Sequence, residues 1–211
     1  FPIMQEDGSM TMTTYTVDYV FDLWSKIHAF GLIPSKKEEA PLLLFRGTQF
    51  SLMSEESRAS IISDLDPQGP GKRLFEKGEK SITNWLSKHN KKSRLIGHSL
   101  GGILVAYTMI HCSQFISQEA HETSFAFNLP GLEKDLIKKW NNIESQPRFR
   151  GYITRGDVIS KLGMLFGDIY ELSLNKPLSP VRAHEQIIFS EPLCFLNKVN
   201  IEVSHKGMFE I

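Results

Sequence analysis

The strongest constraint on the fold of this chain is one short stretch, residues 94–102, which reads RLIGHSLGG. It starts as an apolar strand end and contains the pattern Gly97-x-Ser99-x-Gly101. Where a strand turns sharply into a helix, a serine at the turn holds its hydroxyl exposed above the sheet. Glycines suit both flanking positions, because a side chain there would collide with the neighbouring strand or helix. The pattern therefore predicts a strand, a strained turn at Ser99 and a helix.

The residues around this turn favour a functional serine over a chance match of the pattern. Residues 101–112 read GGILVAYTMIHC, a stretch that is apolar and free of charge, as expected of a buried helix. The N-terminus of such a helix would direct backbone N–H groups and a positive dipole end at the serine, where they favour developing negative charge. A bare G-x-S-x-G occurs by chance in many proteins, but here both required neighbours are present. His98, inside the pattern, is expected to pack beside the serine.

Apolar strands alternate with helical patterns along most of the chain. Strands are expected at 41–45, near 94–96, and at 123–127, 149–154 and 169–174. Helices are expected at 17–30, 74–89, 101–112 and 132–140. The first helix is predicted because the apolar residues of 17–30 fall on one helical face. The tail beyond Leu193 is expected to supply one more strand or to pack on an edge of the sheet. Alternation of this kind predicts an α/β fold with a parallel sheet and covering helices.

Length and composition limit the classes of protein. The 211 residues are enough for one domain with a substantial core, and no repeat or linker divides them, so we expect a single domain over 1–211. Residues 1–14 are polar and are expected to be loosely ordered. Because Lys+Arg and Asp+Glu both number 24, no net charge attracts nucleic acid or an anionic membrane. No metal-ligand spacing or phosphate-binding glycine loop appears, so we expect neither a metal nor a cofactor.

The sequence carries no visible targeting signal. No apolar run reaches the length of a bilayer span, and the start FPIMQED lacks the basic-then-apolar order of a signal peptide. A leader that had been cleaved would leave the same start. The two cysteines, Cys112 and Cys194, argue against a disulfide scaffold, and Cys112 is expected to be a buried free thiol. These features favour a cytoplasmic or non-classically secreted protein, and none of them fixes an oligomeric state.

A serine hydroxyl becomes a good nucleophile when a base takes its proton, and that base is usually a histidine oriented by a buried carboxylate. In open α/β sheets the reacting groups gather at the carboxyl ends of the strands. Asp157 follows the strand that ends at Thr154, and His184 follows the last loop. The order Ser99, Asp157, His184 is that of the α/β-hydrolases. His205 is a second candidate for the base, and a turn or capping role is the alternative for Asp157.

Four short stretches, in order, carry a resemblance to a known family. They are FRGT at 45–48, GHSLGG at 97–102, FAFNLP at 125–130 and RGDVI at 155–159. Together with His184 they resemble the class 3 (fungal-type) lipases, over about residues 40–190. The resemblance implies an α/β-hydrolase fold, with a mostly parallel central sheet and helices on both faces. It also implies a lipase or phospholipase that forms an acyl-enzyme, with Ser99 as nucleophile, Asp157 as orienting acid and His184 as base.

The same resemblance implies the rest of the site. Thr48 would supply one oxyanion-hole donor, and the backbone N–H of Leu100 would supply the second. A lid is expected over residues 50–62, where Leu52 and Met53 form an apolar island that would contact the substrate. Such a lid implies a lipid or other acyl-ester substrate and a transient contact with a membrane or lipid interface.

Two departures from the family pattern concern the substrate pocket. The stretch Asn128-Leu129-Pro130-Gly131 stands where the family usually has a small residue, proline and arginine, and the segment between 157 and 184 is short. The apolar residues Met164, Leu165 and Phe166 form either a wall of an acyl-chain pocket or part of the core. A soluble carboxylesterase or thioesterase would use the same three catalytic residues. A non-catalytic binding protein that keeps the hydrolase fold is the alternative outside enzymes.

Overall fold

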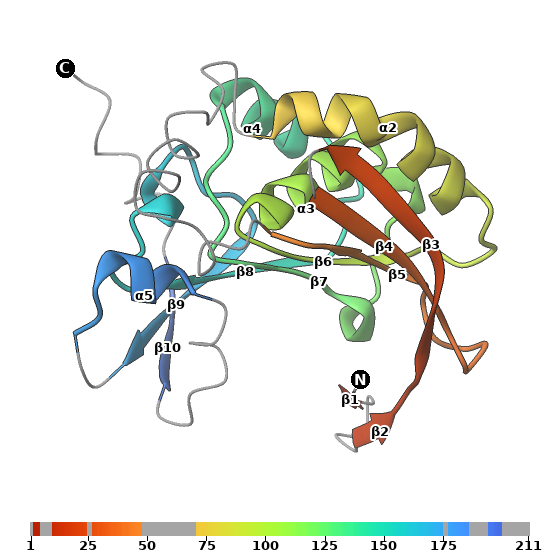
Figure 1. Cartoon of the computed structure of the whole chain (residues 1–211), viewed down its shortest axis with the longest axis horizontal. Coiled ribbons are helices and arrows are strands. Elements are labelled where there is room, and N and C mark those ends of the chain that lie inside the picture. Colours follow the sequence, from red (N-terminus) through yellow and green to blue (C-terminus); the bar gives the residue numbers. More distant parts are fainter. Residues whose placement is uncertain are drawn as a thin grey trace.

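The computed structural model describes residues 2–4, 10–24, 27–47, 71–174, 177–185 and 194–199. Its centre is an eight-stranded sheet in the order β10-β9-β8-β7-β6-β5-β4-β3 (Figure 1). The strands are β3 (Tyr15–Trp24), β4 (Ile27–Pro34), β5 (Leu42–Phe45), β6 (Arg94–His98), β7 (Ser124–Phe127), β8 (Phe149–Thr154), β9 (Asp168–Leu174) and β10 (Cys194–Lys198). Strands β5 to β9 are parallel, and the edge strands join them antiparallel. A separate pair is formed by β1 (Pro2–Met4) and β2 (Met10–Met12).

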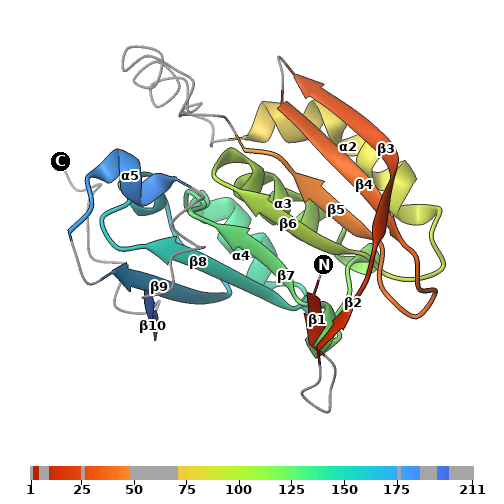
Figure 2. The same cartoon turned by 60° about the horizontal axis from the view of Figure 1, so that its bottom comes forward.

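Helices follow the parallel strands in sequence. They are α2 (Lys72–Ser87), α3 (Leu100–His111), α4 (Lys134–Asn141) and α5 (Pro180–His184), with single 3-10 turns η2 (Ser113–Phe115), η3 (Ala120–Glu122) and η4 (Ile159–Lys161). The predicted α/β class and mostly parallel sheet are confirmed. Helices were predicted on both faces of the sheet. In the structure, the three longest described helices, α2, α3 and α4, all lie on one face (Figures 1 and 2).

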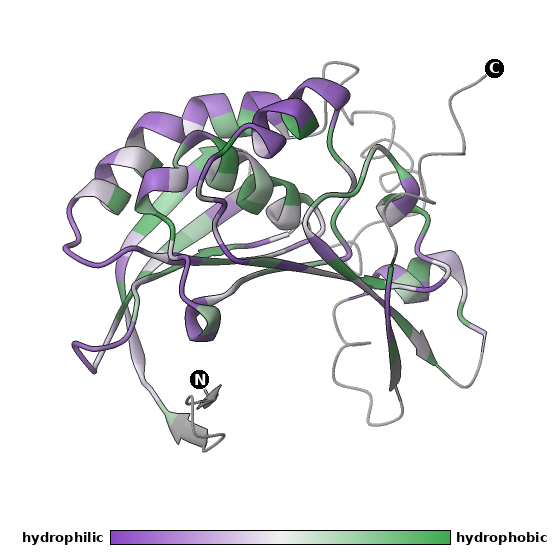
Figure 3. Cartoon of the chain, turned by 180° about the vertical axis from the view of Figure 1, so that it is seen from behind, coloured by the Kyte–Doolittle hydropathy of each residue, from purple (hydrophilic) through white to green (hydrophobic). Residues whose placement is uncertain are grey.

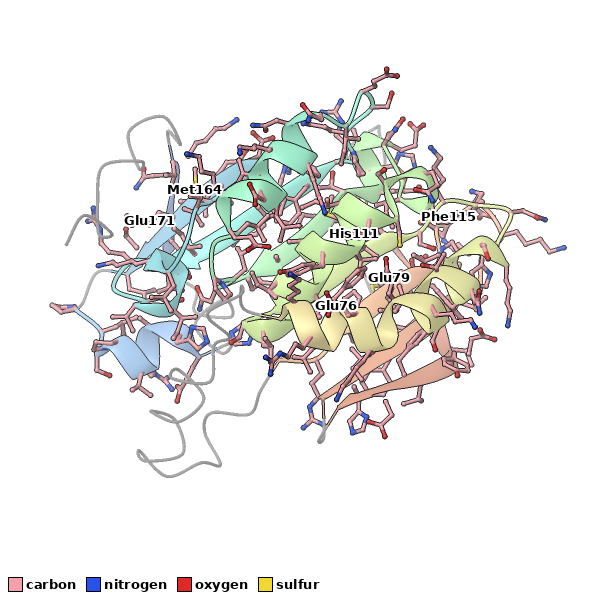
Figure 4. All side chains as sticks on the ribbon, turned by 90° about the horizontal axis from the view of Figure 1, so that it is seen from above. Glu76, Glu79, His111, Phe115, Met164 and Glu171 are labelled. Carbon is pink, nitrogen blue, oxygen red and sulfur yellow. The ribbon has the colours of Figure 1, made fainter. Side chains whose placement is uncertain are left out.

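The core lies between this helical layer and the sheet. Helix α3 is apolar all round, and every residue from Gly101 to Ile110 is buried, as expected of a helix packed on several sides. Helix α2 is amphipathic, and its hydrophobic side faces inward (Figure 3). Its Phe75 stacks on Tyr107 of α3 at 5.4 Å between ring centroids, and burial of such a ring contributes roughly 2–3 kcal/mol. At the outer edge, His111 Nδ1 of α3 lies 3.4 Å from Glu79 Oε1 of α2 (Figure 4).

The other face of the sheet carries a row of aromatic rings. Phe127, Tyr152 and Tyr170 are paired across β7, β8 and β9, with centroid distances of 5.5 and 5.6 Å. On the neighbouring row, the Arg94 guanidinium lies 5.6 Å from the centroid of the Phe125 ring. All five side chains are partly buried. Cross-strand aromatic pairs contribute roughly 0.2–1 kcal/mol each, so these rings stabilise the register of the parallel strands.

Residues 17–30 form strands, and the predicted helix is wrong. They belong to the antiparallel hairpin β3–β4, in which Phe21 pairs with Ala29. The register shifts between Val17 and Tyr19 and again between Asp22 and Trp24. Bulges of this kind break the alternation of a strand, so the apolar residues fall at helix-like intervals. The many aromatic and β-branched residues of this segment favour the strand.

The remaining predicted elements are confirmed, with small shifts at their ends. The tail beyond Leu193 supplies β10, which pairs antiparallel with β9. Cys112 is a buried free thiol at the end of α3, as predicted, and burial raises the pKa of that thiol. Within the described part of the chain, no helix has both the length and the apolar character needed to cross a membrane.

Candidate active site

β6 ends in the sharp turn that the glycine pattern predicts. Ser99 has φ 54° and ψ −124°, a conformation that residues other than glycine rarely adopt. The turn is closely packed: a Cβ on Gly97 would lie 2.3 Å from the Gly101 carbonyl oxygen, and one on Gly101 would lie 2.4 Å from that of Phe45. The Ser99 N–H donates to the Phe127 carbonyl at 2.9 Å. Such strain persists only where the surroundings fix it, and it is concentrated at active sites.

His184 lies between Ser99 and Asp157, and we call these residues the Ser–His–Asp triad. Its Nε2 is 2.7 Å from Ser99 Oγ, and its Nδ1 is 2.9 Å from Asp157 Oδ1. Because a carboxylate only accepts, Nδ1 donates to Asp157 and Nε2 accepts from the Ser99 hydroxyl. The exposed fractions of Ser99, Asp157 and His184 are 2%, 1% and 5%. This arrangement lets the histidine take the hydroxyl proton while the serine oxygen attacks a carbonyl carbon.

Asp157 is held by its own turn at the end of β8. Its Oδ1 also accepts the N–H of Ile159 at 2.9 Å, and its Oδ2 accepts the hydroxyl of Ser160 at 2.5 Å. Its N–H donates to the carbonyl of Thr154 at 3.0 Å. Ile159 and Ser160 were not predicted as site residues from the sequence. The signal that could have found them is an aspartate followed three residues later by serine, since aspartates at turns often bind nearby backbone N–H groups.

Two further side chains, from the ends of β6 and β7, bind the backbone at His184. His98 Nε2 lies 3.0 Å from the His184 carbonyl oxygen, and its ring centroid is 5.4 Å from that of His184. Asn128 Nδ2 donates to the Ala183 carbonyl at 3.0 Å. The sequence placed His98 beside the serine and noted Asn128 only as a departure from a family pattern. Neither contact has a local signal, because the partners are more than fifty positions away.

His98 is neutral near pH 7. Its burial, and secondarily the nearby His184, lower the pKa of His98 to about 4. A neutral imidazole carries one proton, and the carbonyl of His184 can only accept, so the proton of His98 sits on Nε2. His98 therefore donates a hydrogen bond to the backbone of His184 without placing a positive charge beside the His184 imidazole.

The shifted pKa of His98 predicts a loss of stability in acid. Unfolded histidine gains its proton near pH 6.5, whereas His98 in the folded protein does so at about 4. Between these values the unfolded chain binds more protons, so the contribution is complete above pH 6.5 and is lost as the pH falls toward 4. From about pH 7 to about pH 4.5 we expect roughly 2–3 kcal/mol less free energy of unfolding from this residue. His98→Gln should remove that component in urea titrations, and parallel pH curves for the two proteins would contradict it.

Several predicted site residues lie outside the described residues. They are Thr48, Leu52, Met53, the expected lid over 50–62, and the alternative base His205. Leu100 is the first residue of α3, and helix geometry leaves its N–H without an acceptor inside the helix. This N–H, next to Ser99, is therefore available to donate a hydrogen bond to an oxyanion. Its role stays a prediction, as does that of Thr48.

The apolar loop after Asp157 packs against the start and end of α4. Phe166 is buried, stacked on Phe149 at 4.6 Å and edge-on to Trp140 at 5.1 Å between centroids. These contacts favour core packing for this ring. Met164 (Figure 4) forms a backbone bridge with the residues before α4. Met164 and Leu165 are partly exposed, and their contact with an acyl chain stays a prediction. Among the described residues, no group of three or more His, Cys, Asp or Glu side chains could hold a metal ion.

Comparison with solved structures finds fungal lipases. A mutant form of MDLA from Penicillium cyclopium matches with a TM-score of 0.59 and 16% identity, covering 92% of this chain and 73% of its own. A triacylglycerol lipase from Penicillium expansum matches at 0.53 and 13%, covering 88% and 73%. The native Rhizomucor miehei lipase propeptide complex matches at 0.57 and 15%, covering 77% of this chain and 58% of its own. The chain thus spans less than two thirds of the Rhizomucor protein. At these identities the likeness concerns the fold alone, and it confirms the predicted α/β-hydrolase fold.

Comparison at the level of sequence finds a family but no individual relative. No curated protein matches the chain. The model of one family, described as Mbeg1-like, matches residues 35–174. That match includes β5 to β9, the strained serine turn and Asp157, and it covers well over half of the sequence. This protein therefore belongs to the Mbeg1-like family, a lipase-like family of the α/β-hydrolase fold.

Proposed function

We propose that this protein is a serine ester hydrolase that cleaves acyl esters of lipids, as a lipase or phospholipase. The observation that carries the proposal is the pair of hydrogen bonds in the Ser–His–Asp triad, 2.7 Å from Ser99 to His184 and 2.9 Å from His184 to Asp157, at a strained turn. The fold of the fungal lipases and membership in the Mbeg1-like family support the same chemistry. The lipid nature of the substrate is inferred from the likeness to the lipases.

In the proposed reaction, Ser99 Oγ attacks the ester carbonyl carbon while His184 Nε2 takes the hydroxyl proton. The carbonyl electron pair moves to its oxygen, where the N–H of Leu100 and a donor from Thr48 would stabilise the negative charge. Collapse of this intermediate expels the alcohol, which receives the proton from His184, and leaves Ser99 acylated. A water molecule that gives a proton to His184 then attacks the acyl carbonyl carbon. The bond from that carbon to Ser99 Oγ breaks, the carboxylic acid leaves, and His184 returns the proton to Ser99 Oγ. Asp157 keeps the imidazole oriented and stabilises its positive charge.

We propose that an opening step gives the ester access to the triad. Ser99 is 2% exposed, and an ester carbonyl must contact its Oγ before any reaction. We propose that the segment over 50–62, in which Leu52 and Met53 are apolar, is the lid and exposes its apolar side at a lipid surface. Met164 and Leu165 would then contact the acyl chain.

The test is a panel of esters of increasing chain length, assayed below and above the concentration at which each ester aggregates. We expect activity on a long-chain ester to rise sharply where aggregates appear, because the interface stabilises the open lid. A short-chain ester that stays monomeric is the matched control and should show no break. Simple saturation for all esters would favour the soluble carboxylesterase or thioesterase. Absence of hydrolysis by folded protein would contradict the proposed function and favour a binding protein.

A further inference from the structure

The segment that carries His184 has little structure of its own. Helix α5 is five residues long, Pro180–His184, and its side-chain cap is Ser179, which accepts the N–H of Arg182 at 3.3 Å. A single helical turn is not stable in isolation, because few hydrogen bonds offset the entropy of fixing its backbone. The position of His184 therefore depends on what the rest of the protein contributes to this segment.

Two consecutive carbonyls of this segment are held by the ends of two adjacent strands. The Ala183 carbonyl accepts from Asn128 Nδ2 at 3.0 Å, and the His184 carbonyl accepts from His98 Nε2 at 3.0 Å. His98 is the last residue of β6, and Asn128 directly follows β7. The two bonds flank the Cα of His184, so they restrain the backbone from which the imidazole projects.

Asn128 also connects this segment to the strand end that carries Asp157. Its Oδ1 accepts the N–H of Thr154 at 2.8 Å, and the Thr154 carbonyl accepts the N–H of Asp157 at 3.0 Å. Both ends of one amide are therefore used, by a residue that is completely buried. Asn128 has φ 47°, a left-handed conformation that asparagine tolerates better than most residues. The carbonyl of its neighbour Phe127 accepts the N–H of Ser99. Asn128 and this neighbour therefore make hydrogen bonds to the backbone of the serine turn, of the α5 segment and of the strand end before Asp157.

We propose that Asn128 and His98 are positioning residues that hold the backbone of His184 where its Nε2 reaches Ser99. This inference rests on the proposed function, since a reacting histidine needs that restraint. Catalytic groups must be held within about 0.5 Å of their productive positions, and a displacement of about 1 Å can cost roughly 100-fold in rate. Loss of either donor should therefore lower kcat about 10- to 100-fold and leave KM nearly unchanged.

Two variants of Asn128 separate the amide from the backbone conformation. Asn128→Asp keeps the shape and the acceptor for Thr154, but it places an oxygen against the Ala183 carbonyl. Asn128→Gly keeps the left-handed conformation and deletes the amide. Both should lower kcat and the rate at which a fluorophosphonate labels Ser99. Asn84→Asp, on the exposed side of α2, is the control with the same chemical change and should behave as wild type.

Variants of His98 test the second donor by loss and rescue. His98→Leu removes the donor and fills the space, whereas His98→Gln offers an amide N–H at a similar reach. We expect the leucine variant to lose kcat by about 10-fold or more and the glutamine variant to retain most of it. His121→Leu, an exposed histidine at η3, is the matched control and should not affect kcat.

An NMR signal of the Nδ1 proton of His184 reports the position of the base without relying on turnover. In wild type this proton, shared with Asp157, should give a far-downfield resonance that is absent from His184→Ala. The resonance should broaden or move in Asn128→Asp and His98→Leu and persist in His98→Gln. If wild type hydrolyses no ester and labels no serine, the proposed function fails, and this signal alone decides the positioning role. Wild-type kcat with an unchanged resonance in the variants would overturn the inference, as would a fall in activity that follows only a fall in Tm.

Discussion

Ser99→Ala should abolish ester hydrolysis and fluorophosphonate labelling while the protein stays folded. The hydroxyl oxygen 2.7 Å from His184 Nε2 is the attacking atom, and no other group can replace it at that turn. Removing the serine of such a triad typically lowers kcat by roughly 10⁶-fold. The rate enhancement that remains comes from substrate binding and the oxyanion hole. Alanine meets the same backbone strain at φ 54°, so the free energy of unfolding should fall only by about 1–3 kcal/mol, for the lost hydrogen bond and the unsatisfied His184 Nε2.

Initial rates on a chromogenic ester, gel detection of the labelled protein and a thermal melt measure these three quantities. Ser87→Ala, at the exposed end of α2, is a suitable control and should keep full activity. Hydrolysis by Ser99→Ala at the wild-type rate, or a label on another residue, would remove Ser99 from the role of nucleophile.

His184→Ala should have an effect of the same size, and His205→Ala should have almost none. Without the imidazole, no base takes the Ser99 proton, and loss of the triad histidine typically costs about as much as loss of the serine, roughly 10⁶-fold in kcat. The sequence left both histidines as candidates for the base. His184 now has the contacts that the role needs, 2.7 Å to Ser99 and 2.9 Å to Asp157.

The two histidine variants serve as controls for each other, because each makes the same chemical change. Hydrolysis rates and probe labelling of both proteins give the answer. The reverse pattern, with His205→Ala inactive and His184→Ala active, would move the base to the C-terminal tail and leave the observed His184 contacts without a catalytic role.

The parts of the fold that were predicted correctly are those in which one local pattern excludes the alternatives. The run of residues 41–45 is too apolar and too short for anything but a buried strand, and it is β5. The serine turn requires its glycines, since a Cβ on Gly97 would overlap the backbone of Gly101. The nearness of Asp157 to Ser99 follows from a general rule, that reacting groups gather at the carboxyl ends of parallel strands. His184 was proposed from its place in the chain order, and the catalytic roles of both residues stay predictions.

The features that were predicted wrongly, missed or left open depend on contacts between distant parts of the chain, which a local sequence pattern does not contain. Residues 17–30 fit a helical face as well as a strand, because the bulges that hide the strand alternation belong to the pairing with β4. Asn128 and His98 bind carbonyl oxygens, which every residue has, so no residue type in the sequence marks their partners. The sequence left Phe166 open between a pocket wall and the core, and its stack on Phe149 favours the core.

The separation of the triad along the chain has a consequence for folding. Ser99 and His184 are 85 positions apart, and Asp157 and His184 are 27 apart. The entropy of closing such long loops opposes these contacts, so the site needs β6, β7 and β8 paired and α5 docked. Local opening of α5 alone would break the site while the sheet stays protected from hydrogen exchange. The fraction of molecules with an assembled triad is therefore limited by the docking of one helical turn, and it can be smaller than the fraction of folded molecules.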